Sequence, residues 1–275
     1  VMSLTTTVIA LVAFGTGIHA IYTGLELLYL RPQYDAGGLF SWEVRSLDLD
    51  DTPGSGVLKP LLRTFSIVLV GRILVGVALI ALGALDLTGS IPDVAFPVVV
   101  LFALLNDVLV KIRHSVGLSG AFDMSLVTNF GLLIATVFPD GSVEQLAAIL
   151  FIAVQGILGY FLAGLAKAFG EQWRNGDAIE MVVSTKTWGD DRFYRLVSAY
   201  PGTKRLFSWS VIGFEMLFPV VLFLDPSALF VVFGAAFVFH FANAAVVGIN
   251  SFMLMFPATY PAIYFASQLI PWSVI

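Results

Sequence analysis

Long apolar runs, most of them twenty residues or more, follow one another along nearly the whole chain and are separated by turns or by two longer polar segments. A bilayer core of about 30 Å requires about 20 residues of helix, so each run predicts a membrane-spanning helix. The ten-residue alternation that is typical of an outer-membrane barrel does not occur. We therefore expect an all-α polytopic membrane bundle of seven or eight transmembrane helices, formed as a single domain over residues 1–275.

The runs define seven spans and a final stretch of a different kind. The spans cover Leu4–Leu30, Pro60–Leu85, Pro92–His114, Ala121–Phe138, Val143–Phe169, Leu206–Leu224 and Ser227–Phe252. The final stretch, Met253–Ile270, contains two prolines and fits either a kinked eighth span or a re-entrant hairpin. The two longer polar segments lie at 31–59 and 170–204 and carry tryptophans, which favour the membrane interface.

Composition supports this picture and excludes several classes of protein. Apolar residues make up 58% of the chain and charged residues 12%, against roughly 25% charged residues in soluble domains. The net charge of −5 gives no reason to expect a nucleic-acid partner. Without cysteine there are no disulfides, thiolate metal sites or iron–sulfur clusters, and no metal is expected. The first run has no basic segment before it and is long enough to span, so no cleavable signal peptide is expected.

The basic residues alternate along the chain. Of the 14 lysines and arginines, Arg72 alone lies well inside a span. The others lie at or between the ends of spans one and two, three and four, and five and six. The intervening turns carry none. The positive-inside rule then places the basic side in the cytoplasm and the N-terminus outside. We expect an integral protein of a prokaryotic cytoplasmic membrane.

Polar side chains inside the spans are costly in a bilayer, so each is a functional candidate. They come from at least five helices and lie mostly in the half of the membrane nearest the basic loops. The sequence therefore predicts a polar cavity toward one membrane face. The candidates are His19, Glu26, Arg72, Asn106, Asp107, Lys111, His114, Gln155, Lys167, Glu215, His240, Asn243 and Asn250.

Structural interpretations exist for several of these groups. Arg72 could pair with Glu26 or Glu215 and hold helices together. Asp107 and Lys111 are four residues apart and fit a mutual ion pair near the interface. A single histidine or asparagine in a membrane commonly bonds across helices, which is the expectation for His19 and Asn250.

Several short motifs occur in a fixed order. They are Tyr160-Phe-Leu-Ala-Gly-Leu-Ala-Lys167, Trp173-Arg-Asn-Gly176, Phe239-His240-Phe-Ala-Asn243, His114-Ser115 with Gly117, and Glu215 followed by Pro219. Together they resemble the vitamin K-dependent γ-carboxylase-like family, also called the HTTM (horizontally transferred transmembrane) family. The resemblance covers nearly all of the chain, and its specificity comes from the ordered set rather than from any one motif.

The resemblance implies chemistry that is driven by a reduced quinone of the vitamin K type and by oxygen. By position, Lys167 would be the base and His114 its assistant, and the residues expected around the substrate are His240, Asn243, Arg72, Glu215 and Trp173. A low-dielectric pocket disfavours the charged form of an amine, and a neutral amine can accept a proton. A membrane pocket also admits a lipid-soluble quinone from the side and excludes water.

Two functions therefore stand side by side, and the sequence does not decide whether the protein is an enzyme. The first is a quinol- and oxygen-dependent enzyme of the carboxylase/epoxidase type. The second is a non-catalytic membrane subunit that assembles with or matures a partner protein or peptide. The longest polar segment has about 35 residues, so we expect no platform like the large soluble domain with which the animal carboxylase holds its protein substrate.

Two further alternatives are a haem-binding electron-transfer subunit and a transporter. His19 and His240 both lie near mid-membrane and could be the two axial ligands of one haem. The lack of an internal repeat argues against a lipid or small-molecule transporter.

Overall fold

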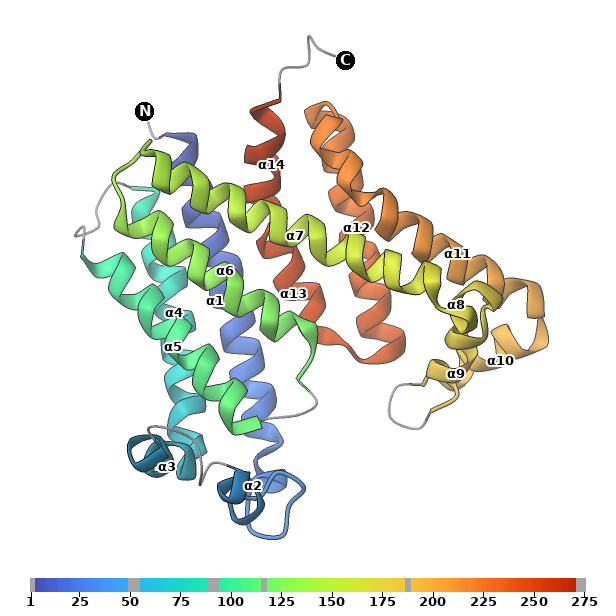
Figure 1. Ribbon diagram of the computed structural model, residues 1–275, viewed down its shortest axis with the longest axis horizontal. Helices are drawn as coiled ribbons and strands as arrows, with labels where there is room; N and C mark the ends of the chain where they lie inside the picture. Colours follow the sequence, from blue (N-terminus) through green and yellow to red (C-terminus); the bar gives the residue numbers. More distant parts are fainter. Residues whose placement is uncertain (1–2, 49–54, 89–93, 115–117, 186–188, 271–275) are drawn as a thin grey trace. The chain divides into compact units, whose positions relative to one another are not determined.

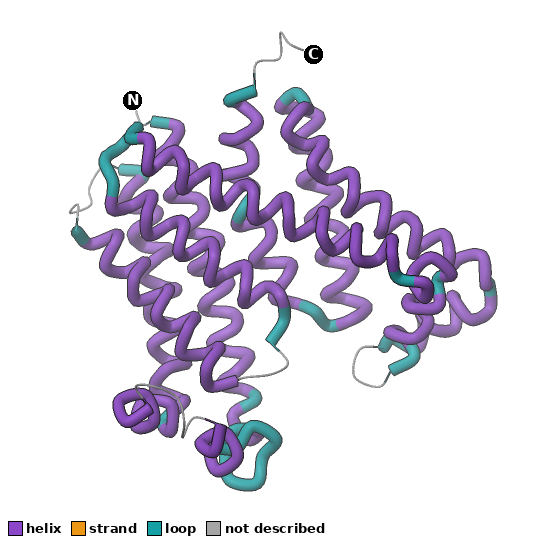
Figure 2. Tube along the Cα trace, viewed as in Figure 1, coloured by secondary structure: helices purple, strands orange, loops and turns teal. Residues whose placement is uncertain are grey.

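The computed structural model describes residues 3–48, 55–88, 94–114, 118–185 and 189–270, and no strand occurs among them (Figure 2). Of the described residues, 86% are helical. Within the described residues, seven helices are long and apolar enough to cross a membrane. The prediction of a polytopic helical membrane protein is therefore confirmed. The chain divides into two compact units, Val1–Ile149 (unit 1) and Leu150–Ile275 (unit 2), whose boundary falls inside one helix.

Unit 1 is built from four long helices that pack side by side. Helix α4 lies against α1 and α5, and α6 lies against α1 and α5 (Figure 1). The side chain of Ser3 accepts a hydrogen bond from the Thr6 amide and so begins α1. The elements are α1 (Leu4–Tyr29), η1 (Arg31–Gln33), α2 (Trp42–Asp48), α3 (Ser55–Arg63), α4 (Phe65–Asp86), α5 (Ala95–His114), α6 (Gly120–Val137) and the first turns of α7 (Val143–Phe169).

The four spans predicted in unit 1 are present, with one shifted start. The second span begins at Phe65 rather than Pro60, because residues 55–63 form the separate helix α3. That helix carries Lys59 and Arg63, whose charges favour the interface over the bilayer interior. The predicted start of the third span, Pro92, lies outside the described residues.

A buried polar network in unit 1 corrects the ion pairs expected from the sequence. The Nη1 atom of Arg72 lies 2.6 Å from Oδ1 of Asp107, and both side chains are almost fully enclosed. The partner of Arg72 within unit 1 is therefore Asp107, where Glu26 or Glu215 was expected. Lys111 pairs with Asp123 instead of Asp107. The error has a simple reason, because spacing within one helix gives no information about the rotation of its neighbours.

Unit 2 contains the remainder of α7 and all later helices. The elements are α8 (Glu171–Asn175), α9 (Asp177–Val183), α10 (Asp191–Ala199), α11 (Pro201–Leu217), η2 (Phe218–Phe223), α12 (Pro226–Val247), α13 (Asn250–Ala258) and α14 (Tyr260–Gln268). The short helices α8, α9 and α10 pack on α11, α12 packs on α13, and α14 packs on η2 (Figure 1). The segment 170–204, which is polar in sequence, is therefore largely helical rather than an extended loop.

The last three predicted elements of unit 2 occur with changed ends. The sixth span changes from α-helix to the 3-10 helix η2 at Phe218, next to Pro219, which has no amide hydrogen to continue the α-helical pattern. The seventh ends at Val247, earlier than predicted. The final stretch forms two nine-residue helices that meet at Thr259. The two alternatives given for this stretch, a kinked eighth span and a re-entrant hairpin, both stay predictions.

Candidate functional site

Helix α7 presents two polar side chains to the interior of unit 2. Tyr160 and Lys167 are seven residues apart and so lie on one face of the helix. Gly164 lies between them, and a Cβ atom at this position would come within 2.7 Å of the Met216 amide nitrogen and 2.8 Å of the Glu215 Cβ. The glycine therefore allows α11 to approach α7 closely enough to bring Glu215 beside Lys167.

Lys167 and Glu215 form a largely buried ion pair. The Nζ atom of Lys167 lies 2.9 Å from Oε1 and 2.7 Å from Oε2 of Glu215. The side chains are 19% and 7% exposed. The ammonium group also lies 5.2 Å from the centre of the Trp173 ring, where the face of the aromatic ring attracts a cation. Since one charge alone would be costly at this depth, the two groups depend on one another.

A cavity of about 700 Å³ adjoins this pair, which lines one part of its wall. A cavity of this size with mainly apolar walls and a few polar groups is typical of a small-molecule site. Its polar side chains include Lys167, Glu215, His240 and Asn243. Its aromatic lining consists of Tyr160, Trp173, Phe193, Phe207, Phe214, Phe239, Phe252 and Phe256. All of these residues belong to unit 2.

A chain of two hydrogen bonds links His240 to Tyr160 and Tyr260. The Tyr160 hydroxyl lies 2.7 Å from Nε2 of His240 and 2.8 Å from the hydroxyl of Tyr260. The imidazole ring packs against Phe256 with 4.8 Å between ring centres. The Nδ1 atom of His240 is buried and has no hydrogen-bond partner among the described residues. One nitrogen of the imidazole is thus held by Tyr160, and the other has no partner.

The Trp173-Arg-Asn-Gly176 motif contributes Trp173 to the lining of the cavity. Gly176 ends α8 with a φ of +85°, a conformation that residues with a Cβ rarely adopt. A Cβ atom there would also lie 2.7 Å from the Arg205 amide nitrogen. The Ser208 hydroxyl bonds to the carbonyl oxygen of Trp173. The motif therefore turns the chain back onto α11 and fixes the Trp173 ring over Lys167.

The structure brings five of the seven predicted site residues to this one cavity. They are Lys167, Glu215, Trp173, His240 and Asn243. The other two, His114 and Arg72, lie in unit 1 and make their described contacts there. Their functional roles, and those of the five residues at the cavity, stay predictions.

His114 ties the polar segment after α1 to the end of α5. Its Nδ1 atom bonds to the Tyr34 hydroxyl, and its ring lies 4.3 Å from the centre of the Phe40 ring. Burial raises the pKa of the Tyr34 phenol above its ordinary value, and the opposing effect of the Arg113 guanidinium is smaller. Tyr34 therefore stays protonated at neutral pH, and the contact is a neutral hydrogen bond rather than an ion pair.

Tyr160 and Tyr260 are the site residues that the sequence reasoning missed. Tyr160 begins one of the quoted motifs, and Tyr260 lies between Pro257 and Pro261 in the final stretch. The available signal was the phenolic hydroxyl in an apolar run, because a buried tyrosine usually has a hydrogen-bond partner.

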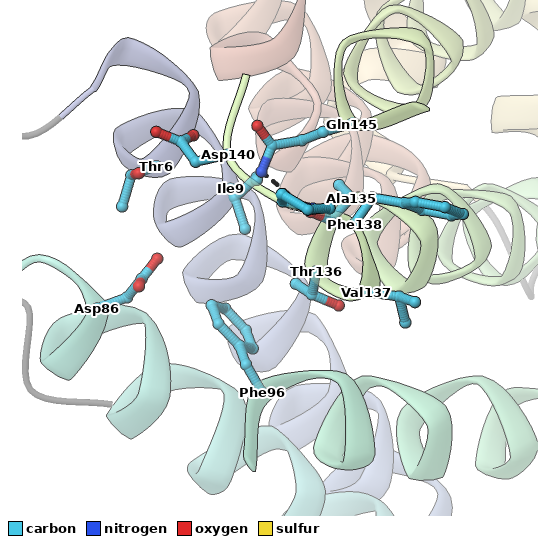
Figure 3. A pocket seen from close by; sticks show the side chains of 11 residues that line it. Thr6, Ile9, Asp86, Phe96, Ala135, Thr136, Val137, Phe138, Asp140 and Gln145 are labelled. Atoms are coloured by element: carbon cyan, nitrogen blue, oxygen red, sulfur yellow. Dashed lines mark hydrogen bonds between the residues drawn. The ribbon is translucent and has the colours of Figure 1, made fainter. Parts of the chain in front are cut away.

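A second cavity, of about 480 Å³, lies in unit 1 and contains none of the predicted site residues. The side chains of Asp86, Phe96, Thr136 and Gln145 surround it, and Gln145 donates to the Ala135 carbonyl oxygen at 3.2 Å (Figure 3). Asp140, at its rim, accepts hydrogen bonds from Ser3 and Thr5. These bonds join the turn after α6 to the start of α1.

The family model of the HTTM domain matches residues 141–268. The matched range contains every residue that lines the cavity of unit 2. No curated protein and no solved structure matches the chain. The expectation of a single domain over residues 1–275 stays a prediction.

Proposed function

The chain is a membrane protein of the HTTM family, with the HTTM domain at residues 141–268, and from this premise we propose that the cavity of unit 2 binds a reduced quinone of the vitamin K type. The reaction class is the oxygen-dependent oxidation of that quinol, of the epoxidase or carboxylase kind. The observation that carries the proposal is an amine–carboxylate pair in the wall of an aromatic, mainly apolar cavity.

The proposed role of Lys167 is to accept the proton of a ligand hydroxyl. As an ammonium it cannot do so, and the carboxylate of Glu215, at 2.7 Å, is the group that can first take a proton from it. In the proposed step this transfer leaves a neutral amine and a carboxylic acid in contact. The neutral amine then takes the ligand proton and becomes an ammonium, with Glu215 and Trp173 holding it in position.

The cavity lining supports a lipid-soluble ligand over a polar one. Eight aromatic side chains contribute to the wall, and flat rings pack well on such surfaces. The bound quinol would supply the reducing equivalents. The protein would supply the binding surface, the proton acceptor and the exclusion of water.

The test is turnover by purified protein in lipid nanodiscs with reduced vitamin K and oxygen, followed as formation of the quinone epoxide. We expect the epoxide from the wild type and none from Lys167→Ala. Lys204→Ala is the matched control, because Lys204 has the same 19% side-chain exposure and pairs with Asp177 and Glu180, but does not line the cavity. Absence of turnover by the wild type with native quinols would exclude the proposal.

A second candidate, a non-catalytic subunit, is favoured by the same ion pair. Lys167 contacts both carboxylate oxygens of Glu215 and a tryptophan ring, which is also how a lysine holds two helices together. A stoichiometric protein partner that co-purifies from native membranes, and equally with a Lys167→Met/Glu215→Leu variant, would favour this candidate.

A further inference from the structure

We propose that His240 presents an Nδ1–H donor to the ligand in the cavity of unit 2, and that Tyr160 and Tyr260 are positioning residues which hold the imidazole in this tautomer. The inference rests on the proposed function in one respect, namely that the cavity takes a ligand. It adds a requirement on the ligand: a hydrogen-bond-accepting oxygen at the His240 end.

The direction of the hydrogen bonds begins at Tyr260. Its hydroxyl is buried and bonds to the Tyr160 hydroxyl at 2.8 Å, with no other partner among the described residues. A hydroxyl has one hydrogen to donate, and a buried hydrogen without an acceptor is costly. Two hydrogen bonds join Tyr260, Tyr160 and His240, so one of their three hydrogens has no acceptor in either direction. If Tyr260 donates to Tyr160, the unpaired hydrogen lies on His240, which lines the cavity, where a ligand oxygen can accept it; in the reverse direction it lies on Tyr260, which does not line the cavity. We therefore take Tyr260 as the donor to the oxygen of Tyr160.

The hydrogen of Tyr160 then points to the imidazole. The remaining contact of its hydroxyl is with Nε2 of His240, at 2.7 Å. Tyr160 is 2% exposed, so its hydrogen has no access to bulk water. Because Tyr160 donates, Nε2 must be the acceptor and carries no proton.

A neutral imidazole with an unprotonated Nε2 carries its hydrogen on Nδ1. His240 lies among phenylalanine rings, and no acidic group contacts it in the part of the chain that the structure describes, so the neutral form is the expected one. Its Nδ1 atom has no partner, and the residue lines the cavity. A residue of the cavity wall thus carries one unused N–H donor.

The donor lies apart from the Lys167–Glu215 pair. Tyr160 and Lys167 project from positions seven residues apart on α7, and a rise of about 1.5 Å per residue separates these positions by roughly 10 Å. The cavity therefore has two polar ends. A ligand that meets both carries an acceptor oxygen near His240 and a hydroxyl that can lose its proton near Lys167.

The tautomer can be measured without any ligand by 15N NMR of protein labelled at histidine. The chain has three histidines, so His19→Phe and His114→Gln variants assign the signals. We expect His240 to be protonated at Nδ1, and Tyr260→Phe and Tyr160→Phe to shift the population toward the Nε2-protonated form. Tyr264→Phe is the control, since Tyr264 lies one turn further along α14 and stacks on Phe230. Protonation at Nε2 in the wild type would overturn the assignment.

The ligand requirement is tested with two substitutions that each keep one nitrogen of the imidazole. An asparagine amide occupies the place of Nδ1, and a glutamine amide that of Nε2. With a reduced naphthoquinone carrying a short isoprenoid tail as the probe, we expect His240→Asn to bind nearly as well as the wild type. His240→Gln should lose about tenfold in affinity, the effect of one hydrogen bond.

The opposite order, with His240→Gln binding better than His240→Asn, would show that the Tyr160 contact alone matters and would overturn the proposed donor. A probe that lacks one ring oxygen should bind the wild type and His240→Gln about equally. If the wild type binds no quinol at all, the proposed function fails, whereas the NMR measurement still decides the tautomer.

Discussion

Among the described residues, two largely buried ion pairs link membrane helices, one in each unit, and they differ in what surrounds them. In unit 1, the Asp107 carboxylate accepts hydrogen bonds from Arg72 at 2.6 Å, Ser125 at 3.0 Å and Asn129 at 2.7 Å. The Arg72 and Asp107 side chains are 2% and 3% exposed. In unit 2, the Glu215 carboxylate accepts from Lys167 alone among the described residues, and the pair lines a cavity.

Under the proposed function, the difference separates a pair that holds helices together from a pair that takes part in proton transfer. A carboxylate with three donors is fully satisfied, and moving a proton onto it would break several bonds at once. A carboxylate with one partner can exchange a proton with that partner at small cost. The proposed difference in role therefore rests on the number of donors around each carboxylate and on access to a cavity.

Removing one member of the enclosed pair should have the largest effect on folding. Asp107→Leu leaves the Arg72 guanidinium buried without a counter-charge, and such a loss costs about 3–5 kcal/mol. We expect a large fall in the thermal midpoint of the purified protein, or no monodisperse protein at all. The measurement is thermal unfolding in detergent, followed by tryptophan fluorescence.

The double variant Arg72→Met/Asp107→Leu is the control for this experiment. It removes both charges together, so most of the stability should return, because apolar residues often replace a buried pair without loss. Equal damage from the single and the double variants would mean that the charge itself is not the cause, and the comparison between the two pairs would lose its basis.

The pair at the cavity should respond in turnover more than in stability. Glu215→Gln keeps an acceptor for Lys167 but removes the group that takes its proton. We expect quinol turnover to fall by about 10²-fold or more, the range for loss of a general base, with a modest change in KM. Glu180→Gln is the control, because Glu180 is an acidic partner of Lys204 away from the cavity. An unchanged kcat in Glu215→Gln would mean that the Lys167–Glu215 pair has a structural role, like the Arg72–Asp107 pair.

The sequence predicted the elements well because the bilayer constrains them strongly. Seven spans follow from the length of the apolar runs, and every one of them is present in the structure, some with shifted ends. The cost of burying charge also identified Arg72, Asp107, Lys167 and Glu215 as notable residues. The length of an apolar run and the cost of burying a charge within it are properties of a single helix. Both can therefore be deduced from the sequence without knowledge of the neighbouring helices.

The partners of these residues could not be predicted, because pairing depends on how helices rotate and approach. Asp107 is four residues from Lys111, yet the rotation of α5 turns it toward Arg72 on α4. Lys167 meets Glu215 because Gly164 lets α11 come close, and the effect of one small residue depends on which helix faces it. Tyr260 was missed for the same reason, since its partner lies 100 positions away in sequence.

A third ion pair, Lys111–Asp123, should contribute the least to stability. Lys111 and Asp123 form an ion pair between α5 and α6, but their side chains are 55% and 60% exposed. Exposed pairs contribute about 0–1 kcal/mol, since water and salt compete with the contact. We expect Asp123→Asn to leave the thermal midpoint nearly unchanged. Above about 0.5 M salt, where the Debye length is short and screening is strong, any remaining difference from the wild type should disappear. A loss as large as that of Asp107→Leu would mean that exposure does not set the value of these pairs, and that lipid or a neighbouring molecule encloses the Lys111–Asp123 contact in the membrane.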